Sequence, residues 1–94
     1  SEGFPRTLWE AMANCIPVVT TNVGSIPYFI DNENHALLVE PNRADELFFA
    51  VKRIMEEEKL RRTLIKNAFE LVKEVTLENQ SRLLIDIIKD SNDE

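Results

Sequence analysis

The first half of the chain places short apolar runs between turn residues. Leu8, Ala11 and Met12 follow the i, i+3, i+4 spacing of a helix that buries one face, and Pro5 suits the first position of such a helix. We therefore expect a short helix over residues 5–13.

Two short, apolar, β-branched stretches follow this helix. Residues 16–20 are mostly apolar at successive positions, which is typical of a strand buried on both faces of a parallel sheet. A second strand is expected within the stretch HALLVEP, where Pro41 ends it. Between the two, Ser25 and Pro27 indicate a helical turn. Strands separated by helical segments indicate an α/β fold with a parallel sheet.

After residue 42 the spacing of apolar residues becomes that of long helices. Asn42 is expected to cap the first helix, the second is expected to begin at about Glu58, and Thr76 is expected to cap the third. The apolar stripe of the first helix comprises Leu47, Phe48, Val51, Ile54 and Met55.

The third of these helices carries more apolar surface than one core contact requires. Leu83 and Ile87 are part of this surface. Either they cover an interface whose partner lies outside this chain, or the helix is buried on both faces between the other two helices. Exposure of both side chains would favour the first interpretation.

Composition limits the class of protein. The chain has 94 residues, a net charge of -6 and one cysteine, Cys15. Acidic chains are repelled by nucleic acids and anionic membranes, and a single cysteine fits a reducing cytoplasm. The 94 residues show no signal-peptide pattern, membrane-spanning run or His/Cys metal spacing. Two short strands cannot complete a doubly wound domain, so we expect a fragment whose missing strands lie upstream.

Glu2 and Glu10 flank the start of the first helix, eight positions apart. The helix N-terminus favours an anion such as phosphate, and Gly3 lets the backbone approach a ligand closely. A carboxylate accepts hydrogen bonds from vicinal hydroxyls, so the pair suits a nucleotide-sugar. Alternatively, Thr7 and Glu10 match a capping box, in which Glu10 would bond only a backbone N–H. A helix that starts at Pro5 would place Thr7 too far inside to cap.

The stretch SEGFPRTLWEAMANCIPVVTTNVGSIPYFIDNENHALLVEP resembles the donor-binding half of the retaining glycosyltransferases of family 4, which have the GT-B fold. Their signature runs E-G-F-P, E-A-M-A, a P-V-V strand, a G-G-I-P turn and a G-x-L-V-x-P strand. The resemblance is strong from Ser1 to about Pro41 and weaker through the helices, where VTLEN is similar to the start of the family's last helix.

The resemblance implies that residues 1–94 are the C-terminal part of a nucleotide-sugar-binding domain. This part would be a partial Rossmann-like unit with two short parallel strands and three C-terminal helices. The N-terminal acceptor domain and the upstream strands would be absent.

The resemblance also implies roles for individual residues. Glu10 would bind the ribose hydroxyls, Glu2 would be the catalytic residue beside the donor sugar, and Leu8 would be an apolar neighbour of the nucleotide. Backbone N–H groups at the helix start would face the sugar and the diphosphate. These groups belong to Gly3, Phe4, Arg6 and Thr7.

Enzymes of this family transfer a sugar from a nucleotide-diphosphate sugar to a sugar, lipid or glycan acceptor with retention, without a bound metal ion or cofactor. The resemblance therefore implies a cytoplasmic, hexosyltransferase-like enzyme whose only membrane contact would be peripheral, through the missing domain. The fragment alone would be inactive, since the active site lies between two domains. The alternative is a stand-alone α/β binding or interaction module that uses its helical face. The intact Glu2 and Glu10 favour the glycosyltransferase.

Five positions depart from the family pattern, namely Cys15, Ser25, Tyr28, Asn32 and His35. Cys15, Asn32 and His35 stand where glycine is usual, and Ser25 replaces the second glycine of the turn. Asn and His are enriched at positive φ, so we expect the backbone to tolerate these changes.

Four side chains have a structural interpretation beside a chemical one. His35 is expected to be a turn residue rather than a general base, and Cys15 a small buried residue rather than a reactive thiol. Trp9 is expected to pack toward the sheet rather than stack on a ligand. Arg6 is expected to be exposed, although it could assist the diphosphate.

Overall fold

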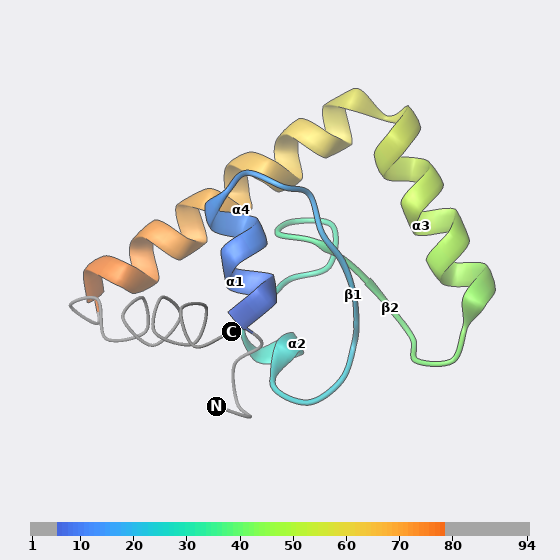
Figure 1. The fold of residues 1–94 in the computed structure, drawn as a ribbon, viewed down its shortest axis with the longest axis horizontal. Helices are drawn as coiled ribbons and strands as arrows, with labels where there is room; N and C mark the ends of the chain where they lie inside the picture. Colours follow the sequence, from blue (N-terminus) through green and yellow to red (C-terminus); the bar gives the residue numbers. More distant parts are fainter. Residues whose placement is uncertain (1–5, 79–94) are drawn as a thin grey trace.

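The computed structural model describes residues 6–78, and Figure 1 shows their path. Four helices and two strands make up this part of the chain. In chain order they are α1 (Arg6–Ala13), β1 (Val19–Thr21), α2 (Ile26–Phe29), β2 (Leu37–Val39), α3 (Ala44–Glu56) and α4 (Glu58–Glu78). No helix of this part is both long and apolar enough to cross a lipid bilayer.

β1 and β2 form a parallel two-stranded sheet within the described residues, with Val19 opposite Leu37. This confirms the predicted α/β fold with two short parallel strands. β1 begins later than the sequence predicts, at Val19 rather than residue 16. Pro17 has no N–H to donate, and the Val18 carbonyl accepts the Leu37 N–H at 3.0 Å just before the strand.

The sheet is covered on both faces, as the apolar character of its strands requires. On one face, Trp9 and Met12 of α1 pack in a cluster with Ala36, just before β2. On the other face, Ala50 of α3 packs with Leu37 of β2. Within β2, Leu38 packs with the first cluster and Leu37 and Val39 with the second, because side chains alternate across a strand.

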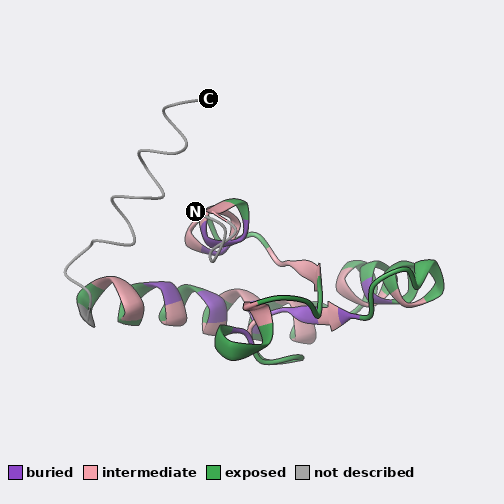
Figure 2. Ribbon diagram, turned by 90° about the horizontal axis from the view of Figure 1, so that it is seen from below, coloured by how far each residue is buried: buried purple, intermediate pink, exposed green. Residues whose placement is uncertain are grey.

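α4 contributes to both core layers. Leu64 in its first half packs with α3 and β2, and Ala68 and Val72 in its second half pack with α1. Figure 2 shows the buried residues of the long helix as purple segments. α4 therefore holds α1 and α3 in place on opposite faces of the sheet.

Arg61 closes the C-terminal end of α3. Its guanidinium donates to the Ile54 carbonyl at 2.7 Å and to the Met55 carbonyl at 3.4 Å. A cation at this end satisfies unpaired carbonyls and interacts favourably with the helix dipole. Glu57 is extended, and α4 begins at Glu58, as predicted.

Asn42 does not cap α3, so this prediction is wrong. Asn42 has a left-handed backbone (φ 62), and Arg43 is the N-cap, without a side-chain cap hydrogen bond. Glu46 in the first turn instead accepts the N–H of Glu40 at 2.9 Å. A first-turn carboxylate thus reaches back to the chain before the helix, much as in a capping box.

Thr76 does not start a new helix, because α4 runs through it to Glu78. Val72 and Val75 pack against α1 in this turn, so the apolar stripe of α4 continues without a break. The rest of the predicted third helix, including Leu83 and Ile87, lies outside the described residues.

Cys15 ends α1 in a left-handed conformation, with φ 61. Its N–H donates to the Met12 carbonyl at 3.2 Å, and the Ile16 N–H donates to the Ala11 carbonyl at 2.9 Å, as in a Schellman motif. The prediction that Cys15 is buried is wrong, because this position closes the helix and is exposed. The backbone conformation that favours glycine is nevertheless present there.

Replacing Cys15 with glycine is expected to stabilise the chain. Left-handed φ brings the Cβ of an L-residue close to a carbonyl oxygen, and glycine has no Cβ. We expect the free energy of unfolding, measured by urea denaturation, to rise by about 0.5–1 kcal/mol, after the larger entropy of glycine in the unfolded chain is subtracted. Cys15→Ala keeps the Cβ and is the control. Equal stabilities of the glycine and alanine variants would contradict this explanation.

Candidate functional site

The carboxyl ends of β1 and β2 meet at one edge of the sheet, because the strands are parallel. Residues 22–25 follow β1 and residues 40–43 follow β2 at this edge. α1 precedes β1 and runs in the opposite direction, so that its N-terminus lies at the same edge, at the bottom of Figure 1. Ligands of open α/β sheets bind at this edge.

α1 separates a buried face from an open polar face. Trp9 and Met12 are 2% and 0% exposed in the core. Arg6, Thr7 and Glu10 lie on the other side of the helix, where Arg6 and Glu10 are half-buried and Thr7 is exposed. Three of the sequence-predicted site residues of this helix, Arg6, Thr7 and Glu10, therefore lie together on the face that points away from the core.

The backbone carbonyl of Glu10 is hydrogen-bonded, but its side chain has no partner among the described residues. Its carbonyl accepts the Asn14 N–H at 3.1 Å and the Asn14 Nδ2 at 2.7 Å. No hydrogen bond or ion pair joins its carboxylate to another residue between 6 and 78. Thr7 is inside α1, which already includes Arg6, so Thr7 is not an N-cap and the capping-box interpretation is wrong.

The other predicted site residues have different positions. Leu8 is 8% exposed and packs in the core. Its contact with a nucleotide stays a prediction. Glu2, Gly3 and Phe4 lie outside the described residues. Among the described residues, no group of three His, Cys, Asp or Glu side chains could hold a metal ion.

His35 is a turn residue, as predicted. Its Nδ1 accepts the Asp31 N–H at 3.0 Å, and the neighbouring Asn32 Oδ1 accepts the Leu38 N–H at 2.8 Å. This turn precedes β2 and therefore lies at the amino end of the strand, away from the candidate site. The residue with positive φ in this turn is Glu33 (φ 69), not Asn32 or His35. The sequence pattern therefore indicated positive φ at the wrong residues of the turn.

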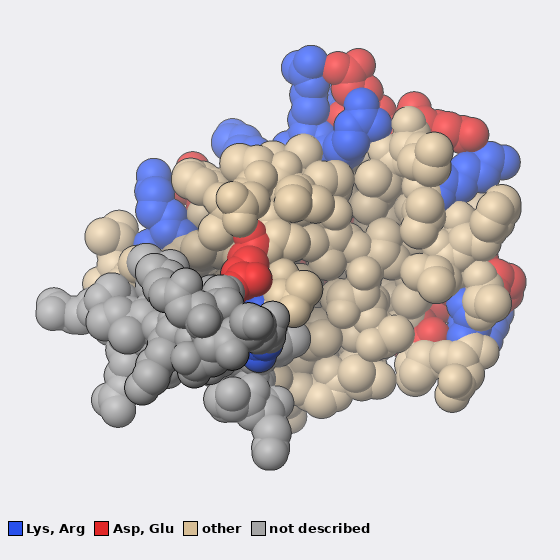
Figure 3. Space-filling view, in the orientation of Figure 1, with Lys and Arg blue, Asp and Glu red and all other residues tan. Residues whose placement is uncertain are grey.

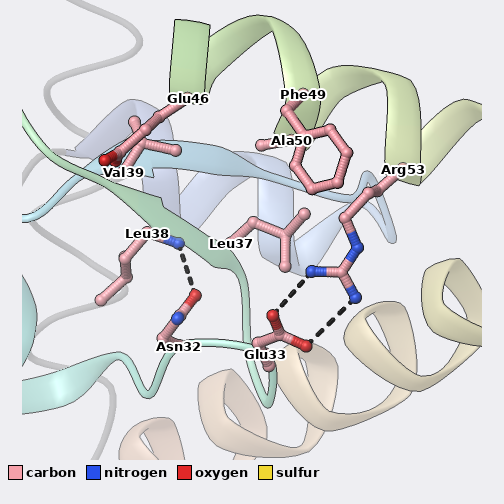
Figure 4. A pocket seen from close by; sticks show the side chains of 9 residues that line it. All are labelled: Asn32, Glu33, Leu37, Leu38, Val39, Glu46, Phe49, Ala50 and Arg53. Atoms are coloured by element: carbon pink, nitrogen blue, oxygen red, sulfur yellow. Dashed lines mark hydrogen bonds and ion pairs between the residues drawn. The ribbon is translucent and has the colours of Figure 1, made fainter. Parts of the chain in front are cut away.

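A hollow between β2 and α3 was not predicted from the sequence. It encloses about 230 Å³, with Leu37, Phe49 and Ala50 in its wall (Figure 4). Ligand pockets usually reach ~300–1,000 Å³ and offer unsatisfied polar groups. Here the charged groups already have partners, since Arg53 bonds Glu33 and Glu46 bonds a backbone N–H. The hollow is therefore a structural feature rather than a second candidate site.

Arg53 joins the turn before β2 to α3. Its guanidinium donates to the two Glu33 carboxylate oxygens at 2.6 and 3.2 Å and to Glu57 at 3.3 Å. The hydrogen bonds from Arg53 lower the pKa of Glu33 below its ordinary value of 4.5. The same carboxylates raise the pKa of Arg53. The sequence could not reveal this pair, since Glu33 and Arg53 are 20 positions apart.

The Arg53 ion pair is expected to give a pH-dependent contribution to stability. Because folding lowers the pKa of Glu33, the contribution is fully present above pH ~4.5 and is lost as the pH falls through the lower, folded-state pKa. The Glu33 side chain is 51% exposed, so solvent screening limits the contribution to about 0.5–1 kcal/mol. Arg53→Met should therefore reduce the free energy of unfolding near neutral pH, and the difference should shrink in acid.

Arg62→Met is the matched control for this measurement. Arg62 pairs with Glu58 at 2.7 Å, but both side chains are well exposed and lie on the same helix. Its removal should change stability by less than Arg53→Met. A stability difference for Arg53→Met that does not vary with pH would contradict the assignment to Glu33.

Comparisons with known proteins place the chain among glycosyltransferases. Residues 1–71 match the family model described as Glycosyl transferases group 1. An uncharacterized glycosyltransferase of Methanocaldococcus jannaschii is 33% identical over 78 residues, which cover 83% of this chain and 22% of that protein. A putative teichuronic acid biosynthesis glycosyltransferase, TuaC, of Bacillus subtilis is 36% identical over 58 residues, which cover 62% of this chain and 15% of that protein.

A solved structure has a similar fold. It is sucrose-phosphate synthase from Thermosynechococcus elongatus, with a TM-score of 0.70 and 30% sequence identity. The similarity covers 93% of this chain and 23% of the synthase chain. The chain thus spans about a fifth of the length of the proteins it matches.

Proposed function

Because the chain belongs to the glycosyl transferases group 1 family, whose fold is GT-B, we propose that it is the C-terminal part of a nucleotide-sugar-binding domain. In this proposal the remaining strands of the domain and the acceptor-binding domain belong to a longer protein. The matched proteins, which are several times longer than this chain, support this division.

The observation that carries the proposal is the position of Glu10. Glu10 is half-buried in the second turn of α1, and its carboxylate has no hydrogen-bond partner among the described residues. A carboxylate in this state can accept two hydrogen bonds from the 2′ and 3′ hydroxyls of a ribose. The helix N-terminus beside it favours the diphosphate of the same ligand.

The neighbouring residues have complementary roles in this proposal. The backbone N–H groups of Arg6 and Thr7 face the diphosphate, together with those of Gly3 and Phe4. Glu2 lies beside the donor sugar, bonds its hydroxyls and acts as the catalytic residue. Leu8 contacts the nucleotide with the small part of its surface that the core leaves open.

We also propose the reaction of the longer protein. As in family 4, it would transfer a sugar from a nucleotide-diphosphate sugar to a sugar, lipid or glycan acceptor with retention. The diphosphate charge would be balanced by the helix N-terminus and by cationic side chains from upstream, without a resident metal ion. The enzyme would be hexosyltransferase-like and cytoplasmic, any membrane contact would be peripheral, and the 94-residue chain would be inactive alone.

Glu10→Gln is expected to weaken nucleotide binding about tenfold, because losing a charge-assisted hydrogen bond costs roughly 1.5 kcal/mol. The chain is titrated with UDP, GDP, ADP and a sugar conjugate of each, and binding is followed residue by residue in NMR spectra. Shifts in the chain are expected to cluster on α1 and on the residues that follow β1. The glutamine variant has the same size, loses the charge and has an NH2 donor in place of one acceptor oxygen.

Glu74→Gln is the matched control, since Glu74 is exposed on α4. This variant should bind as the unchanged chain does. Equal affinities of the chain and the Glu10→Gln variant would remove the ribose role. No shift with any nucleotide at millimolar concentration would instead favour the alternative, a binding or interaction module without catalysis.

A further inference from the structure

The outer face of α3 is apolar and uncovered by the described residues. Ala50 and Ile54 on the inner face pack in the core. On the outer face, Phe48 is 72% exposed, Val51 42% and Met55 73%. Figure 2 accordingly shows α3 largely in green and pink, and Figure 3 shows charged groups mainly around the rim of the viewed face. Exposed apolar surface of this extent marks interaction sites.

The exposed residues follow the spacing of a coiled-coil seam. Ala44, Phe48, Val51 and Met55 are separated by four, three and four positions, and Ala44 is exposed like the other three. This alternation is that of the a and d positions of a heptad, which place one apolar row toward a second helix. The outer face of α3 is therefore shaped for packing against another helix, in addition to the contacts that the inner face makes with α4, β1 and β2.

We propose that a second copy of this chain occupies the outer face of α3, with the two α3 helices antiparallel about a twofold axis. In this register Phe48 packs beside Val51 of the second copy, and Met55 beside Ala44 of the second copy. Each of these two contacts pairs a large side chain with a smaller one, and the twofold axis generates each contact twice. Antiparallel helices also place opposite ends of their dipoles together.

The charges beside the apolar row are self-complementary in the same register. In this row Ala44 and Val51 are the d positions. Asp45 and Lys52 directly follow them, so both lie on the same side of α3, one heptad apart. The twofold axis brings Lys52 close to Asp45 of the second copy, and the reverse pair forms on the other side. Lys52 has no partner among the described residues, and Asp45 pairs only with the exposed Arg43 of its own chain. Opposite charges therefore meet without breaking a buried pair.

The proposed dimer is weak and leaves the candidate functional site open. α3 and α1 pack on opposite faces of the sheet, and in Figure 1 the sheet lies between α3 on the right and α1 to its left. The exposed apolar area of one helix face is a few hundred Å² per copy, given about 150–250 Å² for a whole aromatic side chain. The pair therefore falls below the roughly 1,200–2,000 Å² of stable complexes and should form only at high concentration.

Sedimentation equilibrium of the 94-residue chain tests the proposal. The weight-average mass is expected to rise from monomer toward dimer between about 10 μM and 1 mM. Phe48→Ser should raise the dissociation constant at least tenfold. Phe49→Ser is the matched control: Phe49 is its neighbour on α3 and is 61% exposed, but it lies outside the apolar row and faces the hollow beside β2. This control should leave the dissociation constant unchanged.

Charge reversal tests the register. Lys52→Asp should weaken association, and adding Asp45→Lys to it should restore association, because the double variant exchanges the two charges. Both positions are exposed, so circular dichroism should show an unchanged fold. A monomer mass at every concentration would overturn the proposal, as would equal effects of Phe48→Ser and Phe49→Ser. Dimers that the double variant fails to restore would overturn the antiparallel register.

Discussion

Replacing Trp9 with alanine is expected to remove most of the stability of the chain. Trp9 is 2% exposed and packs in the cluster that joins α1 to α4 and to the residues before β2. Truncating a buried tryptophan costs about 3–5 kcal/mol, through lost burial and the cavity left behind. A chain of this size is only marginally stable, with a total free energy of unfolding near the lower end of about 5–15 kcal/mol.

Circular dichroism during urea denaturation measures this effect, because Trp9 is the only tryptophan and its fluorescence is lost in the variant. Tyr28→Ala is the control, since Tyr28 is an aromatic residue that is 85% exposed. The control should change stability by less than about 0.5 kcal/mol. A denaturation midpoint for Trp9→Ala close to that of the control would show that α1 is not part of the cooperative unit.

Replacing Leu64 with alanine is expected to give the second largest loss of stability. Leu64 is 0% exposed and packs with Leu37, Val39 and Ala50, where α4, β2 and α3 meet. A leucine-to-alanine change in such a site costs about 2–5 kcal/mol, depending on how far the neighbours can collapse into the cavity. The loss should loosen α3 first, because the core contact of α3 is small and Ala50 is its single buried residue.

Hydrogen exchange and urea denaturation together test this prediction. The amides of α3 should exchange faster in Leu64→Ala than those of α1, whose contacts belong to the other cluster. Leu77→Ala is the control on the same helix, since Leu77 is 73% exposed. Similar protection of α3 in both variants would mean that Leu64 does not hold α3 to the sheet.

The order of helices and strands could be predicted from the sequence because it depends on local spacing. The helix over Arg6–Ala13, the turn at Ile26–Phe29 and the two short strands follow from the period of their apolar residues and from proline positions. Predictions that rested on one residue did less well. Asn42 and Thr76 have side chains that favour capping, yet neither lies at the start of a helix. Arg43 is the N-cap of α3, and α4 continues through Thr76.

The candidate site could be predicted in part. The spacing of Glu2 and Glu10 suggested a ligand site, whereas the spacing of Thr7 and Glu10 suggested a capping box, and Glu10 belongs to both patterns. The structure separates them for Glu10, because α1 includes Arg6 and leaves Thr7 inside the helix. Glu2 lies outside the described residues, so its role stays a prediction.

The sequence by itself determined the α/β class, the order of the elements from α1 to the start of α4 and the family signature around Glu10, since all three are encoded in residue types and short spacings. Only the tertiary structure decided which apolar residues are covered. Ile54 and Phe48 belong to the apolar stripe that the sequence predicts for this helix, yet Ile54 packs against the core and Phe48 is 72% exposed. The contact of Arg53 with Glu33 was decided in the same way. Both outcomes depend on which distant segments pack together, and the local pattern of a sequence does not contain that information.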